Sequence, residues 1–66
     1  MFSLNEKILQ EAKELARKML VSGDVTSAVR SVSGAEIACV STDKSQVLPL
    51  ASFQVESETF YLGHRL

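Results

Sequence analysis

The sequence has few of the residues that small proteins use to stabilise themselves covalently or through a metal. Among its 66 residues there is one cysteine, Cys39, and one histidine, His64. A single cysteine excludes a disulfide bond within the chain, and one cysteine with one histidine is too few for a Cys/His zinc site. We therefore expect no metal and no cofactor, and we expect stability to come from packing or from a partner chain.

An excess of charge of one sign and a long apolar run are also missing. Seven Lys or Arg residues against eight Asp or Glu residues give a formal net charge of −1, so the chain lacks the basic surplus that draws proteins to nucleic acid or anionic lipid. No apolar stretch near the start is long enough for a signal peptide or a membrane span. Because a lone cysteine also fits a reducing compartment, we expect a cytoplasmic protein without a membrane partner.

Residues that break regular structure are scarce too. The chain has one proline and three glycines, and 45% of its residues are hydrophobic, which is typical of a globular protein. A chain of this length buries only about 60% of the surface that its unfolded form exposes. We therefore expect a single compact domain, residues 1–66, of marginal stability.

The clearest pattern that is present is an amphipathic helix near the start of the chain. Ser3 and Glu6 have the S-x-x-E spacing of a capping box. Beyond them, apolar residues recur every three or four positions and charged residues fill the positions between, which is typical of a helix with one buried side. Gly23 follows as a natural C-terminal cap. The pattern predicts a helix over residues 4–21.

Residues 25–32 fit two structures. Their apolar residues have the i, i+3, i+4, i+7 spacing of a short helix, and Asp24 before them is a good N-cap. The same stretch also alternates, and valine, threonine and serine are poor helix formers, which favours a strand. We predict a short second helix, with a strand as the alternative.

From residue 35 onward the apolar residues recur with a period of two, which indicates strands. The predicted strands are residues 35–41, 46–55 and 59–62, separated by polar turns. Because proline cannot donate a hydrogen bond to a sheet, Pro49 predicts that the second of these strands is an edge strand or is bulged. The predicted fold is α+β, with a long N-terminal helix, a short second helix and a three-stranded antiparallel β-meander.

Both faces of the predicted sheet carry apolar residues, whereas a solvated antiparallel sheet has one polar face. A helix with a single apolar stripe covers one face only. Either the second helix or a bulge at Pro49 shifts the alternation so that only one face is apolar, or the uncovered face binds another protein or a second copy of the chain. Consecutive strand residues such as Phe60 and Tyr61 point to opposite faces. The candidate interface residues are Leu48, Leu50, Phe60 and Tyr61.

No arrangement of catalytic residues is evident in the sequence. Cys39 lies among apolar residues in a predicted strand, where cysteine is usually a small core residue. His64 lacks nearby histidine or carboxylate partners for metal binding or proton transfer, and we expect it at the surface. The serines lack a G-x-S-x-G motif, and there is no glycine-rich phosphate loop. We assign no catalytic, cofactor or metal residues and no small-molecule substrate.

These observations favour a small non-enzymatic protein-binding module, such as a homodimer, inhibitor, adaptor or accessory subunit. The alternative is a DNA-binding transcriptional regulator, because two helices joined near Gly23 and followed by a hairpin would resemble a helix-turn-helix with a β wing. The second helix would carry only Arg30 as a long basic side chain, whereas phosphate contacts normally need several. Nucleic acid is therefore the less favoured partner.

Overall fold

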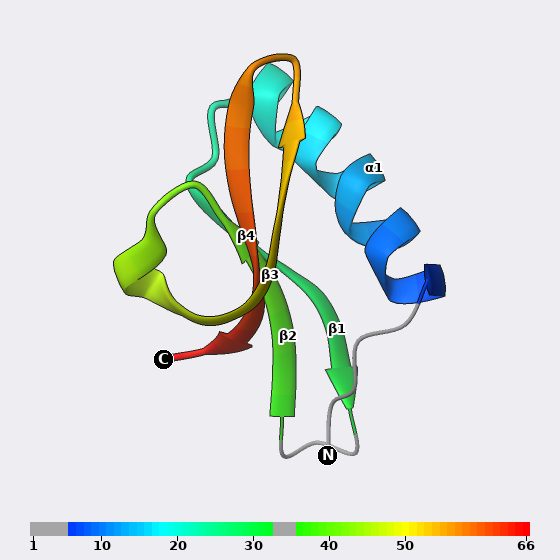
Figure 1. Cartoon of the computed structure of the whole chain (residues 1–66), viewed down its shortest axis with the longest axis vertical. Helices are drawn as coiled ribbons and strands as arrows, with labels where there is room; N and C mark the ends of the chain where they lie inside the picture. Colours follow the sequence, from blue (N-terminus) through cyan, green and yellow to red (C-terminus); the bar gives the residue numbers. More distant parts are fainter. Residues whose placement is uncertain (1–5, 33–35) are drawn as a thin grey trace.

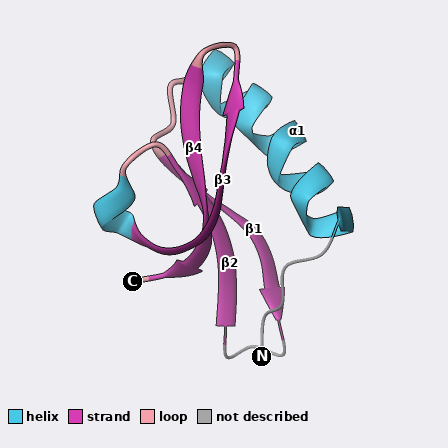
Figure 2. Cartoon of the chain, viewed as in Figure 1, coloured by secondary structure: helices cyan, strands magenta, loops and turns pink. Residues whose placement is uncertain are grey.

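The computed structural model describes residues 6–32 and 36–66, and in these residues one α-helix lies on one face of a four-stranded antiparallel sheet (Figures 1 and 2). The α+β class is therefore as predicted. In this part of the chain no helix is long and apolar enough to cross a membrane. The elements are α1 Glu6–Ser22, β1 Thr26–Val32, β2 Glu36–Ser41, the 3-10 helix η1 Lys44–Gln46, β3 Val47–Val55 and β4 Glu58–Arg65.

The predicted first helix is α1, although its predicted start at Leu4 lies outside the described residues. One narrow stripe of α1 is buried, consisting of Ile8, Ala12, Ala16 and Met19. Small alanine side chains in the middle of this stripe allow the helix backbone to approach the sheet closely. The helix ends at Gly23, which has a φ of 81° and donates its N–H to the Met19 carbonyl at 2.7 Å. This left-handed cap is the one that the glycine predicted.

The predicted second helix is wrong, because residues 26–32 form strand β1, which pairs with β2 in an antiparallel hairpin. The register shifts between Ala28 and Arg30, so Val29 is an extra residue that interrupts the alternation. The interruption produces the helix-like spacing seen in the sequence. These residues have weak helix propensity, and they gain backbone pairing with β2 and packing of Val29 against the core. Both effects favour the strand.

The sheet is not a meander either. The strand order is β1-β2-β4-β3, so β4 lies between β2 and β3 and pairs with both. The three predicted strands all exist, but the chain crosses from one side of β4 to the other through residues 42–46. Because β4 is paired on both sides, it continues to Arg65, beyond the predicted end at residue 62.

Pro49 has the position that its chemistry predicts. It lies in β3, an edge strand, and the register between β3 and β4 shifts between Pro49 and Ala51, so the edge and the bulge are both confirmed. The bulge also reverses the alternation. Val47 pairs with Arg65, on the face of β4 away from α1, whereas the residues after the bulge pair so that Phe53 and Val55 join the core beneath α1.

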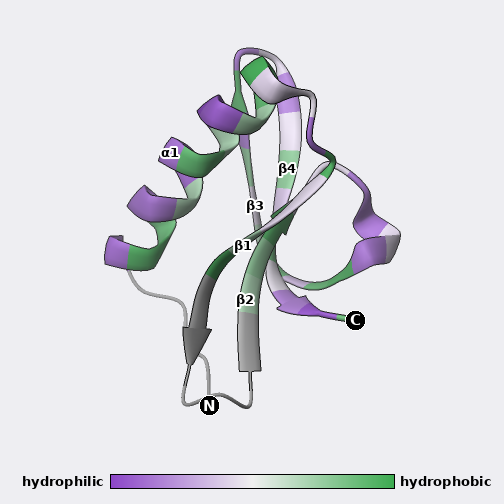
Figure 3. Cartoon of the chain, turned by 180° about the vertical axis from the view of Figure 1, so that it is seen from behind, coloured by the Kyte–Doolittle hydropathy of each residue, from purple (hydrophilic) through white to green (hydrophobic). Residues whose placement is uncertain are grey.

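The main core fills the space between α1 and the sheet. It combines the buried stripe of α1 with Ala38 and Val40 of β2 and with Phe60 and Leu62 of β4. The ring of Phe53 in β3 stacks on that of Phe60, with centroids 5.8 Å apart and an interplanar angle of 14°. Figure 3 shows that the hydrophilic side of α1 is turned away from the strands.

Gly63 in β4 should tolerate no side chain. A Cβ atom there would overlap the carbonyl oxygen of Leu48, which belongs to the backbone of β3 just before the bulge. We expect Gly63→Ala to displace β3 and to lower the free energy of unfolding by about 1–3 kcal/mol or more. Urea denaturation measures this loss, and NMR chemical shifts should change along residues 47–51.

Gly23→Ala is the matched comparison, because a Cβ atom at Gly23 meets nothing within 4 Å. Only its positive φ of 81° opposes alanine, at a cost of about 1 kcal/mol. The β3 resonances should stay unchanged in this variant. A milder effect for Gly63→Ala than for Gly23→Ala would contradict the close approach of β3.

Candidate protein-binding surface

The four predicted interface residues do not share one surface. Phe60 is fully buried beneath α1, so it belongs to the core and leaves the interface set. Leu48 and Leu50 in β3 are 56% and 48% exposed. Tyr61 is half-buried on the opposite face of β4 from Phe60, as consecutive strand residues require. Three of the four residues remain accessible.

Leu50 and Tyr61 lie on the same shallow groove. The groove has a volume of about 280 Å³ and lies where η1, the bulge of β3 and β4 meet. Leu48 does not line the groove: it is exposed near the start of β3 and pairs with His64, which places it on the opposite face of the sheet from Tyr61. We call the groove together with Leu48 the β3 surface. The groove is lined by Lys44, Pro49, Leu50, Ala51, Ser52 and Tyr61.

The sheet face away from α1 is partly covered by the chain itself. Cys39, Ser41 and Val47 pair with β4 residues of that face, yet each is at most 1% exposed. The backbone N–H of Asp43 donates to the Ser41 hydroxyl at 2.9 Å, which places the crossover of residues 42–46 over this face. Part of the apolar surplus in the sequence is therefore buried within the chain.

The rest of this face is polar. After the bulge, Ser52 pairs with Tyr61 and Gln54 pairs with Thr59, and these serine, glutamine and threonine side chains are exposed. A shift of the alternation at Pro49 was the alternative to a fully apolar second face, and over residues 51–55 it is confirmed. On this side, the accessible apolar side chains described above lie in the groove.

Hydrogen bonds hold the crossover in place beside the groove. The hydroxyls of Thr26 and Ser41 are 2.7 Å apart, which ties β1 to the end of β2. The Asp43 carboxylate accepts hydrogen bonds from the backbone N–H of Ser45 at 3.0 Å and from its hydroxyl at 2.7 Å. This cap begins η1 and positions Lys44 at the rim of the groove. Among the described residues, no buried side-chain polar atom lacks a hydrogen-bond partner.

The two residues considered for chemistry lie on neighbouring strands, Cys39 on β2 and His64 on β4. Cys39 is buried, as predicted, and burial raises the pKa of its thiol, although the nearby Arg65 charge opposes part of this effect. His64 is half-buried in β4, opposite Ala38 on one side and Leu48 on the other, rather than at a free surface. In residues 6–32 and 36–66, no three His, Cys, Asp or Glu side chains are grouped to hold a metal ion.

Sequence reasoning missed Lys44 and Ser52 as parts of the groove. Lys44 was assigned to a polar turn, and nothing local in the sequence indicates that η1 brings it beside Tyr61. Pro49 was the available signal, because a proline in a strand marks an edge or a bulge, and the groove is built on that bulge. The helix-turn-helix of the DNA-binding alternative has lost its second helix, since residues 26–32 are β1.

Comparisons with protein-family models, with curated proteins and with solved structures find no significant match to this chain. The β3 surface and the sheet edges are therefore the features from which a function is inferred.

The cap at Asp43 should make stability depend on pH. The Ser45 hydroxyl, the Ser45 backbone N–H and the Gln46 side chain all hold the pKa of Asp43 below its usual value. A lowered pKa in the folded state means that the stabilisation is present above the pKa of an unfolded aspartate, about 3.9, and is lost as the pH falls through the folded pKa. We expect Asp43→Asn to lose less stability than wild type between pH 6 and pH 3.

Urea midpoints at the two pH values measure this difference, and the remaining carboxylates act as an internal control because both proteins share them. Ser45→Ala removes the largest cause of the shift, so the pKa of Asp43, followed by carboxyl NMR, should rise in that variant. An identical pH dependence for wild type and Asp43→Asn would show that the cap does not stabilise the crossover.

Proposed function

We propose that this protein is a small binding module that holds another protein on the β3 surface. The supporting observation is that two leucines, 56% and 48% exposed, flank a proline on an edge strand beside a half-buried tyrosine. A single exposed leucine is ordinary on a protein surface. Leu50 is exposed in a groove that also contains the Tyr61 ring, and the centres of protein interfaces are enriched in aromatic residues.

The shape of the groove favours a protein side chain over a small molecule. Its volume of about 280 Å³ is at the lower end of the usual range of small-molecule pockets, about 300–1,000 Å³, and the groove is shallow. Pro49 has no N–H to offer an added strand, and the bulge twists the edge, so this edge is poorly suited to strand addition. A partner would therefore dock with side chains, by inserting an apolar group between Leu50 and Tyr61.

The positive charges beside the groove indicate a second property of the partner, a negative charge. Lys44 stands at the rim of the groove, and Arg65 is exposed nearby at the end of β4, opposite Val47. A carboxylate beside the inserted apolar group would be attracted to these cations. The expected partner is a protein whose surface presents an aliphatic or aromatic side chain next to Asp or Glu.

A peptide-display library tests this proposal directly, because random sequences sample every kind of partner segment. Random twelve-residue peptides are selected on the wild-type protein, and those that also bind Leu50→Asp are discarded. We expect the remaining peptides to combine apolar residues with Asp or Glu. We also expect them to shift the NMR signals of Leu48, Leu50 and Tyr61 and to bind Leu50→Asp at least tenfold more weakly, because the new carboxylate enters the groove.

Val21→Asp is the matched control. Val21 is 90% exposed at the end of α1, so this variant replaces an exposed apolar residue by the same charge away from the groove. It should bind the selected peptides as wild type does. Peptides that bind Leu50→Asp and wild type equally, or whose NMR footprint falls on another surface, would refute the proposal.

A further inference from the structure

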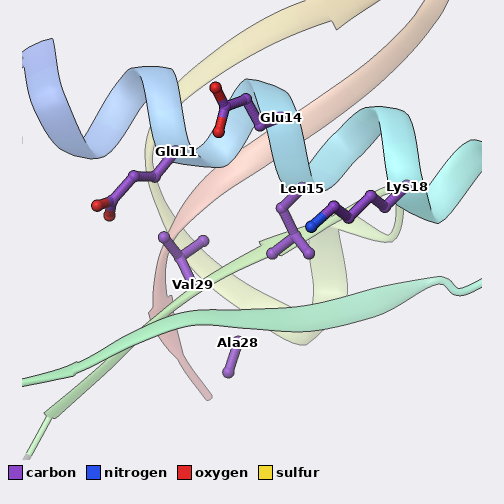
Figure 4. A pocket seen from close by; sticks show the side chains of 6 residues that line it. All are labelled: Glu11, Glu14, Leu15, Lys18, Ala28 and Val29. Carbon is purple, nitrogen blue, oxygen red and sulfur yellow. The ribbon is translucent and has the colours of Figure 1, made fainter.

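The other edge of the sheet has a different construction. β1 is an edge strand and, unlike β3, contains no proline, so every residue keeps its backbone N–H. The helix lies along this edge and forms a groove of about 310 Å³ with it (Figure 4). We call this groove the α1–β1 groove. It is lined by Glu11, Glu14, Leu15, Lys18, Ala28 and Val29.

The helix residues of this groove form one ordered row. Positions 11, 14, 15 and 18 have the spacing i, i+3, i+4, i+7, which places them on one side of a helix. Glu11 lies toward one end of the row and Lys18 toward the other, and the Lys18 side chain runs back along the groove so that its ammonium lies beside Leu15. Figure 4 shows Leu15 and Val29 directed into the space between α1 and β1, while Ala28 points away from the helix.

This row is complementary to itself when reversed. An antiparallel copy of the row, turned about a two-fold axis midway between residues 14 and 15, sets Glu11 against Lys18 of the copy and Lys18 against Glu11 of the copy. The same axis brings the two Leu15 side chains together. Two-fold symmetric interfaces need this kind of pattern, in which each contact appears twice.

We infer that the α1–β1 groove is the docking site for a second copy of this chain, with β1 edge to β1 edge and α1 antiparallel to α1. The lengths agree, because the seven residues of β1 extend about 23 Å and the seventeen of α1 about 25 Å. The open backbone groups of β1 gain partners, and Leu15 and Val29 lose their remaining exposure. A single small core is marginal at this chain length, and the second copy extends it.

Glu14 is the residue of the groove that opposes this dimer. It lies close to the proposed axis, where the two copies of its carboxylate approach one another, but Lys18 one turn later on the same helix offsets part of that repulsion. The Glu11 and Lys18 contacts between copies therefore decide the pairing. The α1–β1 groove shares no residue with the β3 surface, so the two proposals fail or hold separately.

Charge reversal followed by mixing tests the dimer. In Glu11→Lys alone, both contacts between copies join two cations, and in Lys18→Glu alone both join two carboxylates. We expect the dissociation constant of each variant to rise by on the order of tenfold in low salt, measured by analytical ultracentrifugation. When the two variants are mixed, every contact becomes attractive again. The mixture should form heterodimers about as tightly as wild type forms homodimers.

The control is Arg17→Glu, which makes the same charge change as Lys18→Glu at an exposed position outside the groove and should dimerise as wild type does. Recovery on mixing requires that both variants are folded, so it cannot be produced by unfolding, and circular dichroism of each variant checks this. If either variant fails to fold, Glu11→Gln and Lys18→Gln replace the reversals, each with a smaller loss of affinity. A monomeric wild type at about 100 µM, no recovery on mixing, or loss of the dimer only in Leu50→Asp would overturn the inference.

Discussion

The structure depends on one short crossover. β2 and β3 both run antiparallel to β4, so they are parallel to each other with β4 between them. Connections between parallel strands usually need a dozen or more residues, and here residues 42–46 suffice. So short a segment has little freedom, and the bonds of Asp43 to Ser41 and Ser45 fix the path that remains. The crossover inserts β4 into the middle of the sheet, buries Cys39 and Val47 on the second face, and sets Lys44 beside Tyr61.

The bulge at Pro49 lies in β3, the strand that follows the crossover, and it changes which face of the sheet the β3 side chains point to. β3 begins on the second face with Val47 and must deliver Phe53 and Val55 to the core beneath α1. One extra residue reverses the alternation, and Leu50 is left exposed as the result. The approach of the Leu48 carbonyl to Gly63 belongs to the same bend. The exposed apolar residues of the β3 surface are thus a consequence of how the strand changes faces.

Features set by interactions between residues close in sequence could be predicted, whereas features set by contacts between distant residues could not. The helix was predictable because its C-terminal glycine cap and its apolar stripe are local signals. Pro49 predicted an edge and a bulge because proline lacks a backbone N–H donor. β1 was not predictable, since the extra residue at Val29 imitates a helical spacing and only pairing with β2 decides the matter. The position of β4 depends on contacts between distant residues. The opposite directions of Phe60 and Tyr61 were predictable because alternation along a strand is local. Which of the two rings α1 covers was not predictable, because that depends on contacts between distant residues.

The two edges of the sheet are protected in different ways, and this difference is the basis for proposing a different partner at each edge. At β3 the proline and the bulge hinder strand addition and leave side chains to make contacts, whereas at β1 the backbone groups remain available beside a row of charges complementary to itself. With the order β1-β2-β4-β3, a dimer joined at β1 carries its two β3 surfaces at the far ends of a continuous sheet. The two equal sites of such a dimer would bind a partner that presents two copies of its segment with an effective concentration set by their spacing. Self-association at one edge would therefore strengthen binding at the other without any new contact.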